Sequence, residues 1–238
     1  MRNVEKGNTF NDLKNVTVLP LDITNPQQIK ATAEKAIALG QVDVVMNNAA
    51  FGSIGPLEGV TEEQLLKQIN TNLLGAIRVI QAFTPHFREN RNGLFMNITS
   101  SAGLVTFPFA SLYHAAKFGL EGFSEGLTYE LAEFGVQVKT VAPGFIHSSF
   151  GANAEIVSAP AYQAALDQNL KTVSAMMDPT TMGLKPEQVA QIVYDAVTDG
   201  TDQVHYLAGD DTKSLYARRL EIGAEAHRKE IAALFLGQ

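Results

Sequence analysis

Three side chains whose types suit proton transfer stand at fixed spacings in the middle of the chain. Ser100 lies thirteen residues before Tyr113, and Lys117 lies four residues after that tyrosine. Because helix positions i and i+4 share one face about one turn apart, the phenol and the ammonium are predicted neighbours. The apolar run 94–98 just before the serine is typical of a buried strand. A serine at the end of that strand is expected to meet the other two groups across the turn.

These three groups suit proton transfer coupled to hydride transfer. A free tyrosine has a pKa of about 10, which is too high for a group that exchanges protons near neutrality. A lysine charge about 5 Å away, at an effective dielectric of about 20, favours the phenolate by about 3 kcal/mol, or about two pKa units. We therefore expect Lys117 to lower the pKa of Tyr113 into a useful range, while Ser100 holds a substrate oxygen as charge develops. The same spacing also fits a helix with a buried tyrosine and a solvated lysine.

Strand-like apolar runs alternate with helical patterns along the chain. This alternation predicts an α/β fold with a doubly wound parallel sheet, in three layers and in a single domain over residues 1–238. The predicted strands are residues 16–22, 42–48, 94–98, 136–141 and 204–208. The predicted helices are residues 24–40, 62–91, 111–134, 186–199 and 215–235.

Further polar and glycine motifs stand where these elements end. The segment 47–50, Asn-Asn-Ala-Ala, closes the strand 42–48, and Pro143-Gly144 follows the strand 136–141. Asn72 lies within the helix 62–91, three residues before Gly75. Because the carboxyl ends of parallel strands meet at one edge of a sheet, these motifs are expected to gather around Ser100.

In their types and their order, these motifs resemble the short-chain dehydrogenase/reductase superfamily over nearly the whole chain. The resemblance implies a Rossmann-like fold and an oxidoreductase that moves hydride between NADP(H), or NAD(H), and a carbonyl or secondary alcohol. It implies that Tyr113 is the acid/base, that Lys117 contacts the cofactor ribose and that Ser100 orients the substrate oxygen. It also implies that Asn72 distorts its helix and supports the proton path. Ser101 is the alternative to Ser100, and the family's thirteen-residue spacing favours Ser100.

The resemblance also implies a set of cofactor contacts. Asp22 and Ile23 match the positions that meet the adenine, although Asp22 alternatively caps the helix that follows it. Arg2 matches an arginine that binds the 2′-phosphate of NADP, a task for which the guanidinium fork is well suited. The alternative is that Arg2 is frayed together with the start of the chain. The other implied contacts are Asn48, Ala49, Tyr113, Lys117, Pro143, Ile146 and Ser148.

One motif of such folds is missing from the sequence. Dinucleotide folds open with a strand, a glycine-rich turn and a helix whose N-terminus holds the pyrophosphate, but no such segment precedes residues 16–22. Roughly 30 residues, about one strand–helix–strand unit, are absent relative to the family. We therefore expect an N-terminally truncated fold, in which the strand 16–22 loses both neighbours and the strand 42–48 becomes an apolar edge. We expect either that Met1 is not the functional start or that the chain is a truncated product. An alternative function is an inactive relative that serves as a binding or regulatory protein.

The segment 145–185 is less regular than the rest and unusually apolar. It is expected to form a mobile lid over an apolar substrate, although packing onto the core explains part of its composition. Phe107 and Phe109, between the serine and the tyrosine, are expected to line the same pocket. The apolar residues of the lid are Phe145, Phe150, Met176, Met177, Met182 and Leu184.

Composition narrows the classes that remain. The absence of cysteine excludes disulfides, thiolate catalysis and cysteine-ligated zinc, and it fits a cytoplasmic protein. A net charge of −7 argues against a nucleic-acid surface, and no apolar run reaches the ~18 residues of a membrane span. The histidines show no metal-ligand spacing, so no metal is expected. The resemblance implies a homodimer or homotetramer through the helices 62–91 and 111–134, with a small-molecule substrate as the other partner.

Overall fold

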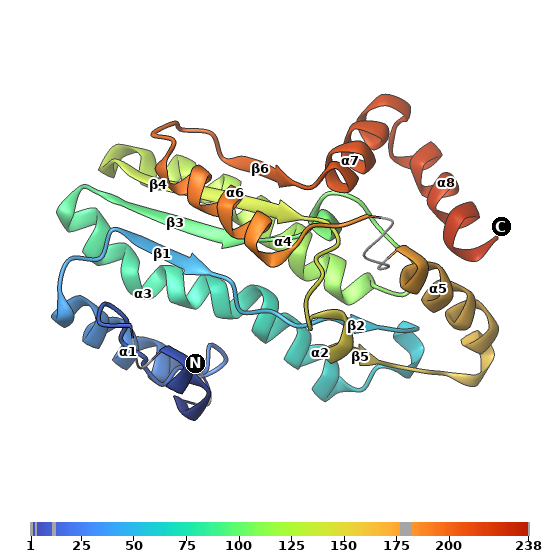
Figure 1. Cartoon of the computed structure of the whole chain (residues 1–238), viewed down its shortest axis with the longest axis horizontal. Helices are drawn as coiled ribbons and strands as arrows, with labels where there is room; N and C mark the ends of the chain where they lie inside the picture. Colours follow the sequence, from blue (N-terminus) through green and yellow to red (C-terminus); the bar gives the residue numbers. More distant parts are fainter. Residues whose placement is uncertain (1, 3, 11–12, 177–181, 238) are drawn as a thin grey trace.

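The computed structural model describes residues 2, 4–10, 13–176 and 182–237, and it is built on a four-stranded parallel sheet (Figure 1). The strands lie in the order β1 (Val44–Asn47), β3 (Gly93–Ile98), β4 (Val136–Pro143) and β6 (His205–Ala208). Their register pairs Val45 with Phe95, Phe95 with Val138, and Val141 with Tyr206. The predicted α/β class is confirmed, and four of the five predicted strands are present.

Helices cover both faces of this sheet, as predicted for three layers. On one face α1 (Pro26–Leu39), α3 (Gly75–Asn90) and α4 (Ser111–Leu131) enclose a core that includes Ile29, Ile80, Phe87, Phe95, Leu131 and Val138. On the other face Val189, Val193 and Ala196 of α6 (Pro186–Thr198) pack against Met96, Val141 and Ala208 of the sheet. The strands therefore bury side chains on both sides, which explains their nearly continuous apolar runs.

The predicted strand 16–22 is wrong. This segment runs without regular structure and pairs with no strand among the described residues, because a strand needs a neighbour to complete its hydrogen bonds. Leu21 and Ile23 still pack against the core that includes Ile29 of α1. The expectation that the strand 42–48 becomes an apolar edge is confirmed. β1 is an edge strand, and its Val44 and Met46 are 36% and 48% exposed.

The C-terminal stretch 215–235, predicted to be helical, is divided between two helices. Gly223 separates α7 (Asp210–Ile222) from α8 (Ala224–Leu236) with a φ of 82°, a left-handed value that favours glycine. Arg218 of α7 pairs with Glu230 of α8 at 2.6 Å and fixes the corner. None of the described helices is long and apolar enough to cross a membrane.

The remaining elements lie mostly at the carboxyl end of the sheet, where the arrows of Figure 1 point. A short parallel pair joins β2 (Ser53–Ile54) to β5 (Glu155–Ile156). α5 (Gln163–Met176) packs against α8 beyond the strand ends, and α2 (Glu62–Ile69) leads into α3. Short 3₁₀ turns cover Val4–Phe10, Leu57–Gly59, Ser101–Gly103, Ala132–Phe134, Gly151–Asn153 and Pro160–Tyr162.

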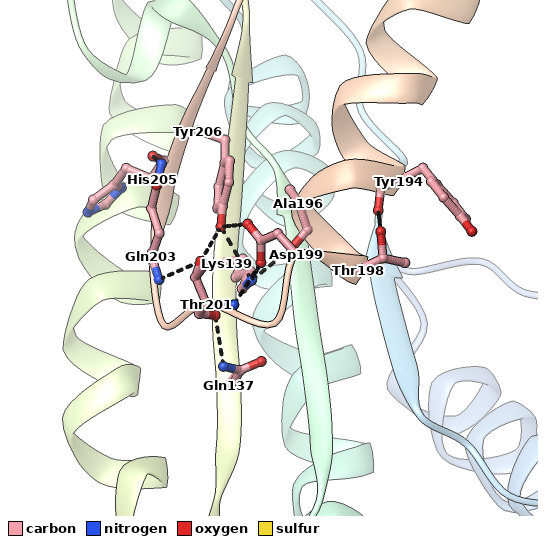
Figure 2. A network of polar contacts seen from close by, with 10 residues as sticks. All are labelled: Gln137, Lys139, Tyr194, Ala196, Thr198, Asp199, Thr201, Gln203, His205 and Tyr206. Carbon is pink, nitrogen blue, oxygen red and sulfur yellow. Dashed lines mark hydrogen bonds and ion pairs between the residues drawn. The ribbon is translucent and has the colours of Figure 1, made fainter.

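A polar network around the buried Lys139 ties α6 to the sheet (Figure 2). Lys139 of β4 is 1% exposed, and its ammonium donates to the Ala196 carbonyl at 2.8 Å and to Asp199 Oδ1 at 2.7 Å. The Tyr206 hydroxyl donates to Asp199 Oδ2 at 2.5 Å. The hydrogen bond from Lys139 has the largest effect on Asp199, followed by the one from Tyr206, and together they hold the pKa of Asp199 well below its usual range.

Candidate active site

Ser100, Tyr113 and Lys117 lie together at the carboxyl edge of the sheet. Ser100 follows β3 and starts the turn Ser101–Gly103, with its side chain accepting a hydrogen bond from the Ala102 amide at 3.1 Å. Tyr113 and Lys117 lie near the start of α4, and the Lys117 ammonium is 5.8 Å from the centre of the tyrosine ring. The structure therefore makes neighbours of the two groups that the i, i+4 spacing brings to one helix face.

Burial controls the protonation of both groups. Burial raises the pKa of Tyr113 to about 12, and a hydrogen bond with the Ser100 side chain offsets part of this rise. Burial lowers the pKa of Lys117 to about 8, against the opposing charge of Glu121. The expectation that Lys117 brings the tyrosine pKa down is therefore wrong for this structure. The prediction weighed only the attraction of the ammonium, whereas removing a phenolate from water costs more.

Asn72 lies on a distorted stretch of its helix, as the resemblance implies. A single π-helical turn, Asn70–Leu74, joins α2 to α3, and Asn72 within it is 2% exposed. Its side chain accepts from the Phe51 amide at 3.0 Å and donates to the Phe51 carbonyl at 2.8 Å. π turns widen a helix and occur frequently at functional sites. Asn72 thereby fixes the segment that follows β1.

Most of the residues expected to contact a cofactor lie along the same edge. Asn48 and Ala49 follow β1 and are exposed, while Pro143 ends β4 and pairs with Ala208. Ser148 is exposed and accepts from the Phe150 amide at 3.3 Å. Because β1, β3 and β4 are parallel neighbours, these groups flank Ser100 on a common rim.

Asp22, Ile23 and Arg2 lie beside that rim. The Thr24 amide and hydroxyl donate to Asp22 at 2.8 and 2.7 Å, and they lower the pKa of this carboxyl, with the charge of Arg2 adding to the effect. Asn25, and not Asp22, caps α1 by accepting from the Gln28 amide at 3.0 Å, so the capping alternative for Asp22 is wrong. Ile23 packs at Gly75, next to the π turn.

The two ends of the segment 145–185 are joined to each other. Ile146 forms a parallel bridge with Leu184, whose amide donates to the Phe145 carbonyl at 2.9 Å. Phe150 lies with its ring centre 6.1 Å from that of Tyr113. Of the other apolar residues of this segment, Met182 is 36% exposed and Met177 lies outside the described residues.

The loop between Ser100 and Tyr113 carries two aromatic residues with fixed positions. Phe107 lies 5.6 Å from Phe235 of α8 and 5.8 Å from the His114 ring, measured between ring centres. Phe109 has a φ of 59°, a strained value for such a side chain, and its carbonyl accepts from the Gly55 amide at 2.7 Å. The C-terminal helix and the loop after β1 therefore both shape this side of the site.

Comparison with known proteins places the chain in a family. The family described as short chain dehydrogenase matches residues 2–156. An uncharacterized oxidoreductase of Schizosaccharomyces pombe is 35% identical over 236 residues, which cover 97% of this chain and 99% of the relative. The chain belongs to the short-chain dehydrogenase family. Retinol dehydrogenase 8 of Bos taurus is 29% identical over 222 residues, which cover 85% of this chain and 71% of that relative.

Solved structures agree with this short-chain dehydrogenase in fold. A short-chain dehydrogenase from Streptomyces avermitilis superposes with a TM-score of 0.82 at 27% identity, covering 98% of this chain and 84% of that one. ElxO, solved with NADP bound, gives a TM-score of 0.70 at 26% identity, covering 87% and 84%. Family membership makes the protein an oxidoreductase with a Rossmann-like fold.

Two carboxylates of this short-chain dehydrogenase were not identified from its sequence. Glu121 lies buried one turn beyond Lys117 and accepts hydrogen bonds from Thr99 and Thr140. Asp211, at the start of α7, accepts from the Phe145 amide at 2.8 Å and fills the space beside Gly144. The position of Glu121 on the Tyr113–Lys117 face of α4 is a signal in the sequence, whereas nothing local marks Asp211.

Proposed function

We propose that this short-chain dehydrogenase moves hydride between NADP(H), with NAD(H) as the alternative, and an apolar carbonyl compound or secondary alcohol. The observation that carries the proposal is the buried Lys117 ammonium 5.8 Å from the Tyr113 ring, with Ser100 bonded to the same tyrosine. A proton donor, a cation and a hydroxyl on one rim match what carbonyl reduction requires.

Each residue then has one task in reduction. Ser100 holds the carbonyl oxygen, and the Tyr113 hydroxyl gives its proton to that oxygen as the carbon is reduced to the alcohol. A pKa of about 12 keeps Tyr113 protonated near neutrality, so the enzyme carries the acid that this direction needs. Lys117 stabilises the phenolate left behind, because its ammonium is close and little water screens it.

The residues present fit a dinucleotide at one end of the site. Bound NADPH supplies the hydride. Pro143, Ile146 and Ser148 would hold the nicotinamide half, Asp22 and Ile23 the adenine, and the exposed Arg2 a 2′-phosphate. NADP in the ElxO structure supports this choice of cofactor. No glycine-rich turn opens a helix toward the site within the described residues, so no group is assigned to the pyrophosphate.

The surroundings of the site support an apolar substrate. Phe107, Phe109 and Phe150 come from two loops that flank Tyr113, and Met182 and Leu184 close the lid segment. Aromatic and thioether side chains favour apolar ligands over charged ones. The similarity to retinol dehydrogenase 8 supports the same class. Pairing of two copies through the outer faces of α3 and α4, where Phe118 is 36% exposed, would give the homodimer or homotetramer.

Replacing Tyr113 by phenylalanine tests the mechanism. The variant loses only the hydroxyl, so turnover of an apolar ketone with NADPH is expected to fall by roughly 10²–10⁴-fold. Tyr194→Phe, at an exposed tyrosine on α6, is the matched control and should retain activity. Undiminished turnover in Tyr113→Phe would rule out the assigned role.

A titration with NADPH separates an enzyme from an inactive relative. Saturable enhancement of nicotinamide fluorescence by the 238-residue chain supports the enzyme, and the absence of any signal supports a binding or regulatory protein that does not use the dinucleotide.

A further inference from the structure

Glu121 is a buried carboxylate with a fixed position behind the catalytic helix. Its side chain is 8% exposed and lies on α4 one turn beyond Lys117. One oxygen accepts from the Thr99 hydroxyl and the other accepts from the Thr140 hydroxyl at 2.9 Å. A Cβ added at Gly103 would lie 3.1 Å from Glu121 Cγ, so the turn Ser101–Gly103 presses on the same side chain. The carboxylate has little room to move.

A buried negative charge is stable only with a positive charge nearby. The charged groups that face Glu121 are Lys117 and Glu125 on α4 and His205 on β6. Lys139 is the neighbour of Thr140 on β4, but its side chain faces the opposite side of the sheet, in the network with Asp199. Glu121 therefore lies between one cation of the active site and one imidazole at the surface.

His205 connects this carboxylate to the solvent. Its Nδ1 lies 3.0 Å from Glu121 Oε2, its Nε2 lies 3.5 Å from Glu125 Oε2, and its side chain is 40% exposed. Figure 2 shows His205 directed away from the network around Tyr206. The hydrogen bond to Glu121 is the main cause of the raised pKa of His205.

We propose that Glu121 is a positioning residue that acts as the fixed counter-charge of Lys117, and that His205 couples this counter-charge to the pH of the solvent. The proposal rests on the proposed function, because Lys117 supports Tyr113 there. The Lys117 ammonium donates to the Ile98 carbonyl at 2.9 Å, so Glu121 acts on it across one helix turn as a charge. When His205 is protonated it shares the carboxylate, and Lys117 then receives less stabilisation.

A direct titration of Lys117 tests this coupling without cofactor or substrate. Lysine labelled with carbon-13 at Cε reports the protonation of each ammonium by NMR, and the signal missing from Lys117→Arg identifies Lys117. We expect a midpoint at a pH of about 8 in the wild-type protein. In Glu121→Gln the midpoint should fall by about one pH unit or more, as expected for losing a unit charge one turn away at an effective dielectric of about 20.

Two further variants complete the experiment. Glu125→Gln removes the exposed carboxylate one turn further along α4. The Lys117 midpoint in this variant should stay within about 0.3 pH units of the wild-type value. His205→Arg places a permanent cation beside Glu121, and the Lys117 midpoint should fall by about half a pH unit. Thermal unfolding of each variant shows whether it is folded. An unchanged Lys117 midpoint in folded Glu121→Gln overturns the proposal, and if that variant does not fold, an unchanged midpoint in His205→Arg does so.

Activity supplies a separate readout. The pH at which ketone reduction declines on the alkaline side should move downward in Glu121→Gln by the same amount as the NMR midpoint. A wild-type protein that reduces no ketone would overturn the proposed function, and the NMR midpoints would still decide the role of Glu121. A shifted NMR midpoint with an unshifted pH profile would overturn the link to catalysis.

Discussion

The Asn72 side chain and the Phe51 backbone form two hydrogen bonds, of 3.0 and 2.8 Å, between the π turn of the long helix and the segment after β1. An asparagine amide that pairs with both the N–H and the C=O of one residue replaces the hydrogen bonds of a neighbouring strand. The irregular helix and the segment with Asn48 and Ala49, which we propose faces the cofactor, are therefore one unit.

Removing this link should weaken cofactor binding as well as stability. In Asn72→Ala the amide and carbonyl of Phe51 lose their partners, at a cost of about 1–3 kcal/mol for each group that stays buried. We expect a lower unfolding midpoint and an NADPH Kd raised roughly tenfold, measured by fluorescence titration. Asn90→Ala, at an exposed position of α3, is the control. Equal NADPH affinity in the two variants would contradict the link.

Gly144→Ala should displace the loop that carries Ile146 and Ser148. Its Cβ would overlap the Asp211 carboxylate, which holds the Phe145 amide at 2.8 Å. We expect weaker NADPH binding in Gly144→Ala and partial recovery in the double variant with Asp211→Ala, since the overlap is then relieved. Gly122→Ala, where the added methyl meets open space on α4, should bind as wild type does. A double variant that binds no better than Gly144→Ala would show that the overlap is not the cause.

Lys139→Met should destabilise the protein without touching the active site. The Ala196 carbonyl and Asp199 lose their buried donor, and such losses cost enough to lower the unfolding midpoint of a chain this size by about 5–10 °C. Lys213→Met removes an exposed lysine that pairs with Asp210 at 3.5 Å, and it should leave the midpoint nearly unchanged. Differential scanning calorimetry measures both, and equal midpoints would contradict the role of Lys139.

The pKa of Asp199 predicts how stability falls in acid. Its folded pKa lies below the unfolded value of about 3.9, so the contribution of this carboxylate is fully present above about pH 4 and is lost as the pH falls through the folded pKa. Asp199→Asn has no proton to bind and should show a shallower loss of unfolding free energy below pH 4. Urea unfolding at pH 3, 4 and 6 checks this, and identical slopes for the two proteins would rule it out.

The parts of the site that depend on local geometry could be predicted from the sequence. The i, i+4 spacing of Tyr113 and Lys117 needs only a helix, and the apolar run before Ser100 needs only a strand. The helix break at Asn72 followed from the resemblance. These three features have their causes within a few residues of the side chains concerned.

The features that depend on distant partners could not be predicted in this way. The segment 16–22 has the composition of a strand, but a strand forms only beside another. The pKa of Tyr113 depends on how much water the surrounding loops exclude, and this exclusion is a property of the folded chain. Glu121 and His205 are 84 residues apart, so their contact is visible only in three dimensions.

Neighbouring residues of β4 serve opposite sides of the sheet, with Lys139 bonded to Asp199 and Thr140 bonded to Glu121. A slip of one position along the adjoining strands would exchange them, pushing an ammonium into the rear of the catalytic helix and a hydroxyl into the cation's place under α6. Such a slip would leave Asp199 without its cation and would take a hydroxyl donor away from Glu121. The register of β4 therefore decides which of these two side chains meets Glu121 and which meets Asp199.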